Sequence, residues 1–311
     1  MSHDMQNPDL CYSLSRRDFL RTAGIGIGSI PVFASPLLSG CKSSDHAMGK
    51  IGLQLYTVRE EIQKDLAGTL KKVAAYGFEG VETASWPENV SIKDAGKFLK
   101  DAGLSVFAAH CELPTGENKD RMLEIAESYQ CKKMIWHGWP EDVRYKTREG
   151  VKQLADIYNE ANKFATSNGL EFGLHNHWWE IRDEIDGRYA FQVLMDDLDP
   201  GIFFEIDTYW AKVAGKNPAD VVAYFGKRAP LLHIKDGPAE YNNAVAEDVS
   251  FMVPVGKGTQ NFPEIVKAAA GNTEWMVVEM DRTQTNVFAA IEESYYYLVK
   301  NGLAKGRKPV S

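Results

Sequence analysis

Short apolar segments alternate with longer segments of helical periodicity eight times from Ile51 onward. This alternation predicts parallel strands joined by helices. Eight strand–helix units in about 260 residues match the order and length of a (β/α)8 barrel, so the predicted fold is α/β, a TIM barrel in a single domain. The expected strands are Ile51–Tyr56, Gly80–Thr83, Ser105–His110, Lys133–His137, Glu171–His175, Ile202–Asp207, Leu231–Lys235 and Trp275–Glu279. The expected helices are Lys64–Tyr76, Ile92–Ala102, Lys119–Tyr129, Thr147–Ser167, Gly187–Leu198, Pro218–Phe225, Pro263–Ala270 and Phe288–Lys300.

An open, doubly wound parallel sheet is the main alternative arrangement of the same elements. A dinucleotide-binding sheet of that kind carries a G-x-G-x-x-G turn after its first strand, and the segment IGLQLY is not followed by one. No internal repeat or interdomain linker is evident, so residues 51–311 are predicted to form one barrel.

The composition is that of an ordinary globular protein. The chain of 311 residues is 44% hydrophobic and 25% charged, which excludes a fully disordered or collagen-like protein. Its 35 Lys and Arg against 43 Asp and Glu give a net charge of −8, so nucleic acid is not an expected partner. A mean hydropathy of −0.32 argues against an integral membrane protein. Cys111 and Cys131 form neither a disulfide framework nor a zinc motif, and we expect both to be buried thiols.

The first forty residues are predicted to be an export signal that is later removed. Ser15–Leu20 reads S-R-R-D-F-L and precedes an uncharged, Gly-rich stretch, an order that resembles the twin-arginine signal. The segment Leu38–Cys41 resembles a lipobox, in which Cys41 becomes the lipid-anchored first residue. Residues 41–50 would then be a polar tether. The protein is therefore expected to be exported, and to be periplasmic or attached to the cell envelope only through a lipid on Cys41.

Acidic residues and histidines collect where the predicted strands end. In a barrel these ends converge on one face, where barrel enzymes place their catalytic residues. Buried charges at such a position must be paired or bound to metal. The residues concerned are Gln54, Tyr56, Glu82, His110, His137, His175, His177, Glu180, Asp207, His233, Lys235, Glu279 and Asp281.

Three of these side chains come from the ends of the last three strands. Asp207, His233 and Glu279 combine carboxylate and imidazole, which suits one Mn²⁺, Co²⁺, Zn²⁺ or Mg²⁺ ion. The sequence therefore predicts one divalent metal ion as the cofactor.

The same stretches resemble a known family. HIKD (233–236), FEID (204–207) and VVEMD (277–281) are similar to motifs of the xylose isomerase-like barrels. That group includes sugar phosphate isomerase/epimerases, ketose 3-epimerases, inosose-handling enzymes and abasic-site endonucleases. The resemblance extends from about Ile51 to Leu303 and is more specific for the superfamily than for a substrate.

The resemblance implies a metal held by Glu, Asp, His and Glu from strands five to eight. Asp207, His233 and Glu279 match the last three of these ligands, whereas strand five ends in His175-Asn176-His177 where the family has Glu. Glu180 is the nearest following carboxylate and resembles the trailing Glu of an H-N-H-x-x-E subgroup. We expect Glu180 to be the fourth ligand, with His175 and His177 as the alternatives.

The resemblance also implies chemistry at a carbon next to a carbonyl. Glu279 would bind the metal and remove a proton, while Glu180, His175 or His177 would supply a proton on the other side. Lys235 would stabilise the oxyanion or pair with the neighbouring Asp236. Two acid–base groups flanking one carbon allow isomerisation, epimerisation or elimination.

The expected partner is a small, non-phosphorylated sugar or keto-sugar. Phosphorylated sugars stay in the cytoplasm, and the best phosphate-binding segment near the site, Gly256-Lys257-Gly258, is a weak one. One alternative is a lyase that acts on 3-keto-glycosides, and another is a sugar-binding lipoprotein without catalytic activity. An abasic-site nuclease fits least because of the negative charge and the export signal. A homo-oligomer is left open.

Overall fold

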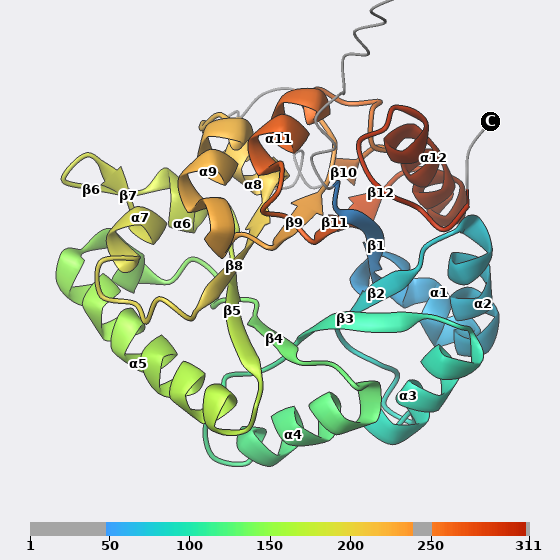
Figure 1. Ribbon diagram of the computed structural model, residues 1–311, viewed down its shortest axis with the longest axis horizontal. Coiled ribbons are helices and arrows are strands. Elements are labelled where there is room, and N and C mark those ends of the chain that lie inside the picture. Colours follow the sequence, from blue (N-terminus) through green and yellow to red (C-terminus); the bar gives the residue numbers. More distant parts are fainter. Residues whose placement is uncertain (1–47, 239–250, 309–311) are drawn as a thin grey trace, which may run out of the picture. The chain divides into compact units, whose positions relative to one another are not determined.

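Eight parallel strands form a closed barrel in a computed structural model, which describes residues 48–238 and 251–308 (Figure 1). The barrel closes where β1 pairs with both β2 and β11, and the predicted single-domain TIM barrel is confirmed. The predicted export signal, Cys41 and residues 41–47 of the tether lie outside the described residues. The barrel strands are β1 Lys50–Gln54, β2 Gly80–Thr83, β3 Ser105–His110, β4 Lys133–Trp136, β5 Glu171–His175, β8 Phe203–Asp207, β9 Leu231–Ile234 and β11 Trp275–Val278.

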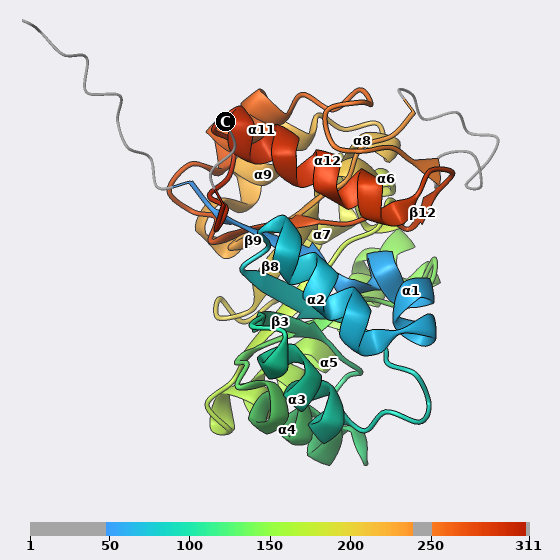
Figure 2. The same cartoon turned by 90° about the vertical axis from the view of Figure 1, so that its right-hand side faces the viewer.

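Helices surround the strands and cover the outside of the barrel, as Figures 1 and 2 show. They pack against it through residues such as Leu70, Leu154 and Ile291, which are fully buried. Two two-stranded sheets, β6 Glu184–Ile185 with β7 Arg188–Tyr189 and β10 Phe251–Met252 with β12 Arg282–Thr283, lie outside the barrel sheet. The helices are α1 Arg59–Lys64, α2 Leu66–Tyr76, α3 Ile92–Asp101, α4 Asn118–Tyr129, α5 Arg148–Ser167, α6 Trp179–Arg182, α7 Ala190–Leu194, α8 Thr208–Val213, α9 Pro218–Phe225, α11 Phe262–Ala269 and α12 Val287–Lys300.

The predicted helix Gly187–Leu198 is wrong in its first part. Residues 184–189 form the β6–β7 hairpin, and α7 starts only at Ala190. Asp186 and Gly187 make the turn with φ angles of +52° and +77°. Positive φ at both central residues is the geometry of a type I′ turn, for which Asp-Gly is a preferred sequence. The dipeptide itself therefore carried the signal for this hairpin.

Side chains at alternate strand positions fill the barrel interior, since successive residues of a strand point to opposite faces. Along β8 the inward series is Phe203, Glu205 and Asp207, so the interior changes from apolar to charged over four residues. Phe203 belongs to a separate apolar cluster near the N-terminal end of the strands. The other members of that cluster are Ala108, Ile135, Leu231, Trp275, Val277 and the partly buried Phe107.

We call the apolar cluster around Phe203 and Trp275 the apolar plug. Glycines in the strands make room for its aromatic rings. Phe107 and Trp275 stack with ring centroids 4.1 Å apart. A Cβ atom on Gly52 would lie 2.4 Å from the Phe107 ring, and one on Gly173 would lie 2.3 Å from the Phe203 ring. These distances are too short for any real contact, so glycine is required for the rings to close this end of the barrel.

Cys111 and Cys131 are buried free thiols in the structure, as expected from the sequence. Within residues 48–238 and 251–308, no helix is long and apolar enough to cross a membrane.

Candidate active site

Asp207, His233 and Glu279 lie together at the C-terminal ends of the adjacent strands β8, β9 and β11. One ligand atom of each lies within 4.8 Å of the others. Their exposed fractions are 0%, 0% and 5%. His233 Nδ1 is 2.7 Å from Glu279 Oε2 and 3.8 Å from Asp207 Oδ2. The structure thus brings together the three metal ligands expected from the sequence.

The positions of these three side chains suit a bound cation. Asp207 Oδ2 and His233 Nδ1 are both buried, and their contacts among the described residues are ion pairs, with Lys235 at 2.9 Å and with Glu279 at 2.7 Å, and not hydrogen bonds of acceptable geometry. Because buried polar atoms in native proteins are nearly always hydrogen-bonded, two ligand atoms that lack such a bond are candidates for binding a cation. Two carboxylates and an imidazole are a donor set that divalent metals accept.

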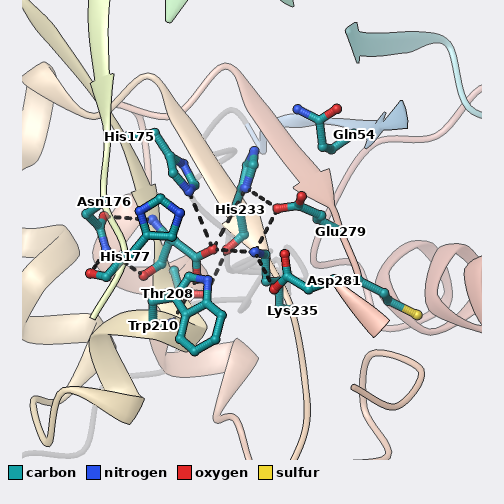
Figure 3. A network of polar contacts seen from close by, with 12 residues as sticks. Gln54, His175, Asn176, His177, Thr208, Trp210, His233, Lys235, Glu279 and Asp281 are labelled. Carbon is teal, nitrogen blue, oxygen red and sulfur yellow. Dashed lines mark hydrogen bonds and ion pairs between the residues drawn. The ribbon is translucent and has the colours of Figure 1, made fainter. Parts of the chain in front are cut away.

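Lys235 is the positive charge closest to this group of ligands, which Figure 3 shows from nearby. Its Nζ lies 2.9 Å from Asp207 Oδ2, 2.8 Å from Glu279 Oε2 and 3.1 Å from Asp281 Oδ2. Burial opposes its charge, but Asp207 and the other carboxylates outweigh that effect and raise the pKa of Lys235 well above its usual value. Lys235 is therefore a buried ammonium group at the edge of the ligand group.

Of the two roles expected for Lys235, pairing with the neighbouring Asp236 is not found. The Asp236 carboxylate instead accepts backbone N–H groups of Gly237, Gly256, Gly258, Thr259 and Gln260 at 2.9–3.2 Å. Both glycine amides of the Gly256-Lys257-Gly258 segment thus already bind a carboxylate of the protein itself, and the Lys257 N–H donates to the Pro254 carbonyl. Because an N–H group held by a carboxylate is not free to bind phosphate, this segment is a poor phosphate site.

Strand five contributes His175, and its side chain turns toward the ligand group. His175 is 4% exposed, and its Nε2 lies 4.0 Å from Asp207 Oδ2. Burial, together with the nearby His233, lowers the pKa of His175 well below its usual value, so the ring is neutral. A neutral imidazole at this position is able to bind metal.

Glu180 lies away from that group, behind His177. It is fully buried, its Oε2 accepts the backbone N–H of His177 at 2.9 Å, and its Oε1 lies 4.0 Å from His177 Nδ1. Burial raises the pKa of Glu180 to about 8. Of the three strand-five candidates for the fourth ligand, the structure brings His175 closest to Asp207 and places Glu180 in neither buried ligand cluster.

His177 faces the open part of the site. It is partly exposed, and its ring stacks on Trp179 with centroids 4.4 Å apart. Burial lowers the pKa of His177 to about 3, with Lys235 adding to the effect, so this ring is also neutral near pH 7. Its Nδ1 and Glu180 Oε1 are buried without hydrogen-bond partners among the described residues.

A second set of charged side chains lies one layer deeper in the barrel. Glu82 and Glu205 are fully buried, and His110 Nε2 lies 3.0 Å from Glu82 Oε1 and 2.8 Å from Glu205 Oε2. Burial opposes a charge on His110, but the two carboxylates outweigh it and raise its pKa to about 10. Glu205 was not singled out from the sequence, although its position two residues before Asp207 on one strand predicts that both side chains face the interior.

A cavity of about 480 Å³ opens above these side chains. Its size lies in the range of pockets that enclose small molecules. Glu279, Lys235, His175 and His177 line it on one side. The remaining lining residues are Gln54, Tyr56, Ala84, Ser85, His110, Cys111, Glu112, Arg121, Ile125, His137 and Asp281.

Comparison with known proteins agrees with this geometry. Residues 70–298 match the family described as xylose isomerase-like TIM barrel. The solved structure of a sugar phosphate isomerase/epimerase from Parabacteroides distasonis is 26% identical, with a TM-score of 0.66, and the match covers 85% of this chain and 98% of that one.

Two further solved structures share the fold at lower identity. An L-ribulose 3-epimerase is 18% identical with a TM-score of 0.63, covering 82% of this chain and 95% of its own. The probable 3-DHS dehydratase AsbF from Bacillus anthracis is 14% identical with a TM-score of 0.64, covering 81% and 99%. No curated protein matches the sequence.

Proposed function

Since this chain belongs to the xylose isomerase-like TIM barrel family, we propose that it is a metal-dependent sugar isomerase or epimerase that removes a proton next to a carbonyl of a non-phosphorylated sugar. The observation that carries the proposal is the convergence of Asp207, His233 and Glu279 below a sugar-sized cavity. A relative described as a sugar phosphate isomerase/epimerase supports the reaction class.

A divalent ion would be held by Asp207, His233, Glu279 and His175, where it would polarise the sugar carbonyl and acidify the adjacent C–H. Glu279 acts as the base. Burial opposes its ionisation, but Lys235 and His233 outweigh that effect and lower its pKa, so Glu279 is ionised at neutral pH. The ammonium group of Lys235, 2.8 Å from Glu279, offers positive charge where negative charge develops on the substrate oxygen.

His177 is the residue placed to pass a proton to the other side of the substrate: its neutral ring would give up its own N–H proton and take another at Nδ1 from Glu180, which its pKa of about 8 keeps protonated and whose Oε1 lies 4.0 Å away. It lines the cavity, whereas Glu180 is fully buried behind it and has no route to a substrate atom. Glu180 therefore acts through His177, whose backbone N–H it holds in a hydrogen bond.

Three features support a sugar without phosphate. Asp236 occupies the backbone amides of the Gly256-Lys257-Gly258 segment. Lys235, which lines the cavity, is already paired with three carboxylates. The export signal expected from the sequence would also keep the protein away from phosphorylated metabolites.

The size of the cavity favours a second candidate, elimination from a 3-keto-glycoside. A hexose has twelve non-hydrogen atoms, which would fill only about 360 Å³ even at the ~30 Å³ that each water takes in the liquid. The cavity of about 480 Å³ leaves room for a substituent on the sugar. In that reaction Glu279 would take H2 next to the C3 ketone, and the aglycone would leave from C1 with a proton delivered to its oxygen.

Both reactions begin with the same proton transfer, so one experiment tests the proposal. The purified protein, loaded with Mn²⁺, is incubated in D₂O with unphosphorylated ketoses, keto-sugars and keto-glycosides. Deuterium should enter substrate or product at the carbon next to the carbonyl. Glu279→Gln should abolish the exchange, whereas Glu274→Gln, at an exposed carboxylate at the opposite end of the barrel, should leave it unchanged.

Three results would contradict the proposal. Turnover without exchange would show another mechanism, and preference for phosphorylated sugars would show that the substrate class is wrong. Tight sugar binding without turnover would indicate a sugar-binding protein instead.

Export and lipidation are proposals of their own, tested in cells. Replacing Arg16 and Arg17 by Lys should leave the protein in the cytoplasm, because the signal receptor distinguishes guanidinium from ammonium. Cys41→Ala should release a soluble exported form. Normal export of the double variant would disprove the twin-arginine assignment.

A further inference from the structure

His233 stands between two pairs of carboxylates, with one ring nitrogen facing each pair. Its Nδ1 faces Glu279 and Asp207 at 2.7 Å and 3.8 Å, as described above. On the opposite edge of the ring, Nε2 lies 2.9 Å from Glu82 Oε1 and 3.1 Å from Glu205 Oε2. The ring is fully buried, so these carboxylates are its polar surroundings among the described residues.

His175 repeats this arrangement on the neighbouring side. Its Nε2 points toward Asp207, while its Nδ1 lies 3.1 Å from Glu205 Oε2. Glu205 therefore contacts both histidines and Glu82 contacts one of them. Figure 3 shows His175 and His233 side by side above the end of the strands.

A neutral imidazole binds metal through one nitrogen and carries its proton on the other. The group that accepts this proton in a hydrogen bond decides which nitrogen is free and how the ring is oriented. For His233 and His175 the nitrogens that point away from Asp207 both face the deep carboxylates. We propose that Glu205 and Glu82 are positioning residues that hold His233 Nδ1 and His175 Nε2 toward the metal; this inference rests on the proposed metal site.

The deep carboxylates are themselves held from their far side. His110 Nε2 lies within 3.0 Å of both, and Gln54 Nε2 donates a hydrogen bond to Glu82 Oε1. Gln54 is fully buried. The side chains of Gln54, Glu82, His110 and Glu205 form one connected layer below His233, and they come from β1, β2, β3 and β8.

This layer compensates for the way in which strand five departs from its family. His175 stands where the family is expected to have a ligand carboxylate, which removes one negative charge from the ligand group. The Glu205 carboxyl group lies behind that histidine, 3.1 Å from its Nδ1, on the side away from Asp207. A histidine backed by a carboxylate is a stronger metal ligand than an isolated histidine.

The test compares three isosteric variants of the full mature chain. Glu205→Gln should weaken Zn²⁺ binding by about 10–100-fold, Glu82→Gln should weaken it less, and Glu274→Gln should leave it unchanged. Affinity is measured by competition with a chelator of known affinity. Co²⁺ absorption spectra should shift in the first two variants, because the orientation of the ligands changes.

A second measurement reads the proton positions directly and does not depend on activity. In the Zn²⁺-loaded wild type, ¹⁵N spectra of labelled histidine should show the proton of His233 on Nε2 and that of His175 on Nδ1. In Glu205→Gln at least one of these signals should change. If that variant does not fold, Glu82→Gln carries the test through His233 alone.

Unchanged affinity and unchanged proton positions in Glu205→Gln would overturn the inference while leaving the metal site intact. Two Zn²⁺ ions per wild-type chain and one in Glu205→Gln would also overturn it, since the deep layer would then be a second metal site. A wild type that binds neither Zn²⁺ nor Co²⁺ would instead remove the metal site of the proposed function, and the positioning role with it.

Discussion

The two ends of the barrel interior are built from the same strands and have opposite chemistry. At the N-terminal end, Trp275 stacks on Phe107, and Phe203 lies in the same apolar cluster beside small strand residues. At the other end, Glu279 and Asp207, four residues further along the same strands, are buried charges. Burying rings stabilises the fold, whereas burying charges costs free energy unless they are paired. The comparison indicates that one end of the barrel holds it together and the other performs its chemistry.

The first way to break this comparison is to remove a ligand at the charged end. Asp207→Ala or His233→Ala should lose bound metal and lower proton exchange by about 10³-fold or more, because each removes a ligand that no neighbour replaces. The free energy of unfolding of the metal-free protein should also fall, by about 3–5 kcal/mol, because Asp207→Ala leaves the buried Lys235 with one carboxylate fewer and His233→Ala leaves four buried carboxylates without the imidazole between them. Metal content by mass spectrometry and urea unfolding check the two parts. Full metal retention by both variants would show that the ligand group is misassigned.

A substitution at the apolar end should lower the stability of the fold and leave metal binding nearly unchanged. Trp275→Ala removes a large ring from the plug and should lower the free energy of unfolding by about 3–5 kcal/mol. The Zn²⁺ affinity of the folded protein should stay within a few-fold of the wild type, because Trp275 lies at the opposite end of β11 from Glu279. Chelator competition on the folded variant checks this expectation. A loss of affinity as large as that of Asp207→Ala would show that the two ends are coupled.

Glu180 offers a test by pH. Its pKa of about 8 in the folded protein lies above its ordinary value of 4.5, so the folded state binds this proton more tightly than the unfolded chain. The free energy of unfolding therefore falls as pH rises from about 4.5 to about 8, by a few kcal/mol in total. Gln does not ionise, so the free energy of unfolding of Glu180→Gln should lack this fall. The difference in stability between the variant and the wild type should therefore shift in favour of the variant as the pH rises over that range. Chemical unfolding of the metal-free proteins at pH 5, 7 and 9 measures the difference, and parallel pH profiles would contradict a buried, neutral Glu180.

The smallest expected effect belongs to the strand glycines of the plug. Gly173→Ala places a Cβ atom 2.3 Å from the Phe203 ring, so the ring must shift. Overpacking of this kind costs about 1–3 kcal/mol. Thermal unfolding measures it, and an unchanged stability of Gly173→Ala would show that the Phe203 ring moves aside without cost.

Regular elements were largely predictable from the chain. Strand and helix periodicity located all eight barrel strands to within two residues, because burial on both faces of a parallel strand leaves a continuous apolar run. The errors came from local turns. Asp65 ends one short helix and caps the next by accepting the N–H of Gly68, and the Asp186-Gly187 turn forms a hairpin inside an expected helix.

The site was predictable in part. The convergence of Asp207, His233 and Glu279 was expected from the sequence, whereas the positions of Glu205 and Glu180 were not. Strand ends are local features, so the residues that converge at the mouth follow from the strand positions themselves. What each side chain then touches depends on contacts between strands far apart in the sequence, such as His233 with Glu82 at a separation of 151 residues.

The amino-acid sequence by itself determined the barrel, its apolar and charged ends and the three side chains that converge at its mouth, because these follow from periodicity along single strands. Only the tertiary structure decided that Glu180 lies behind His177, that Asp236 occupies the glycine-segment amides and that Glu205 stands behind two histidines. Such choices depend on which buried polar groups find a partner within hydrogen-bonding distance once the barrel has closed.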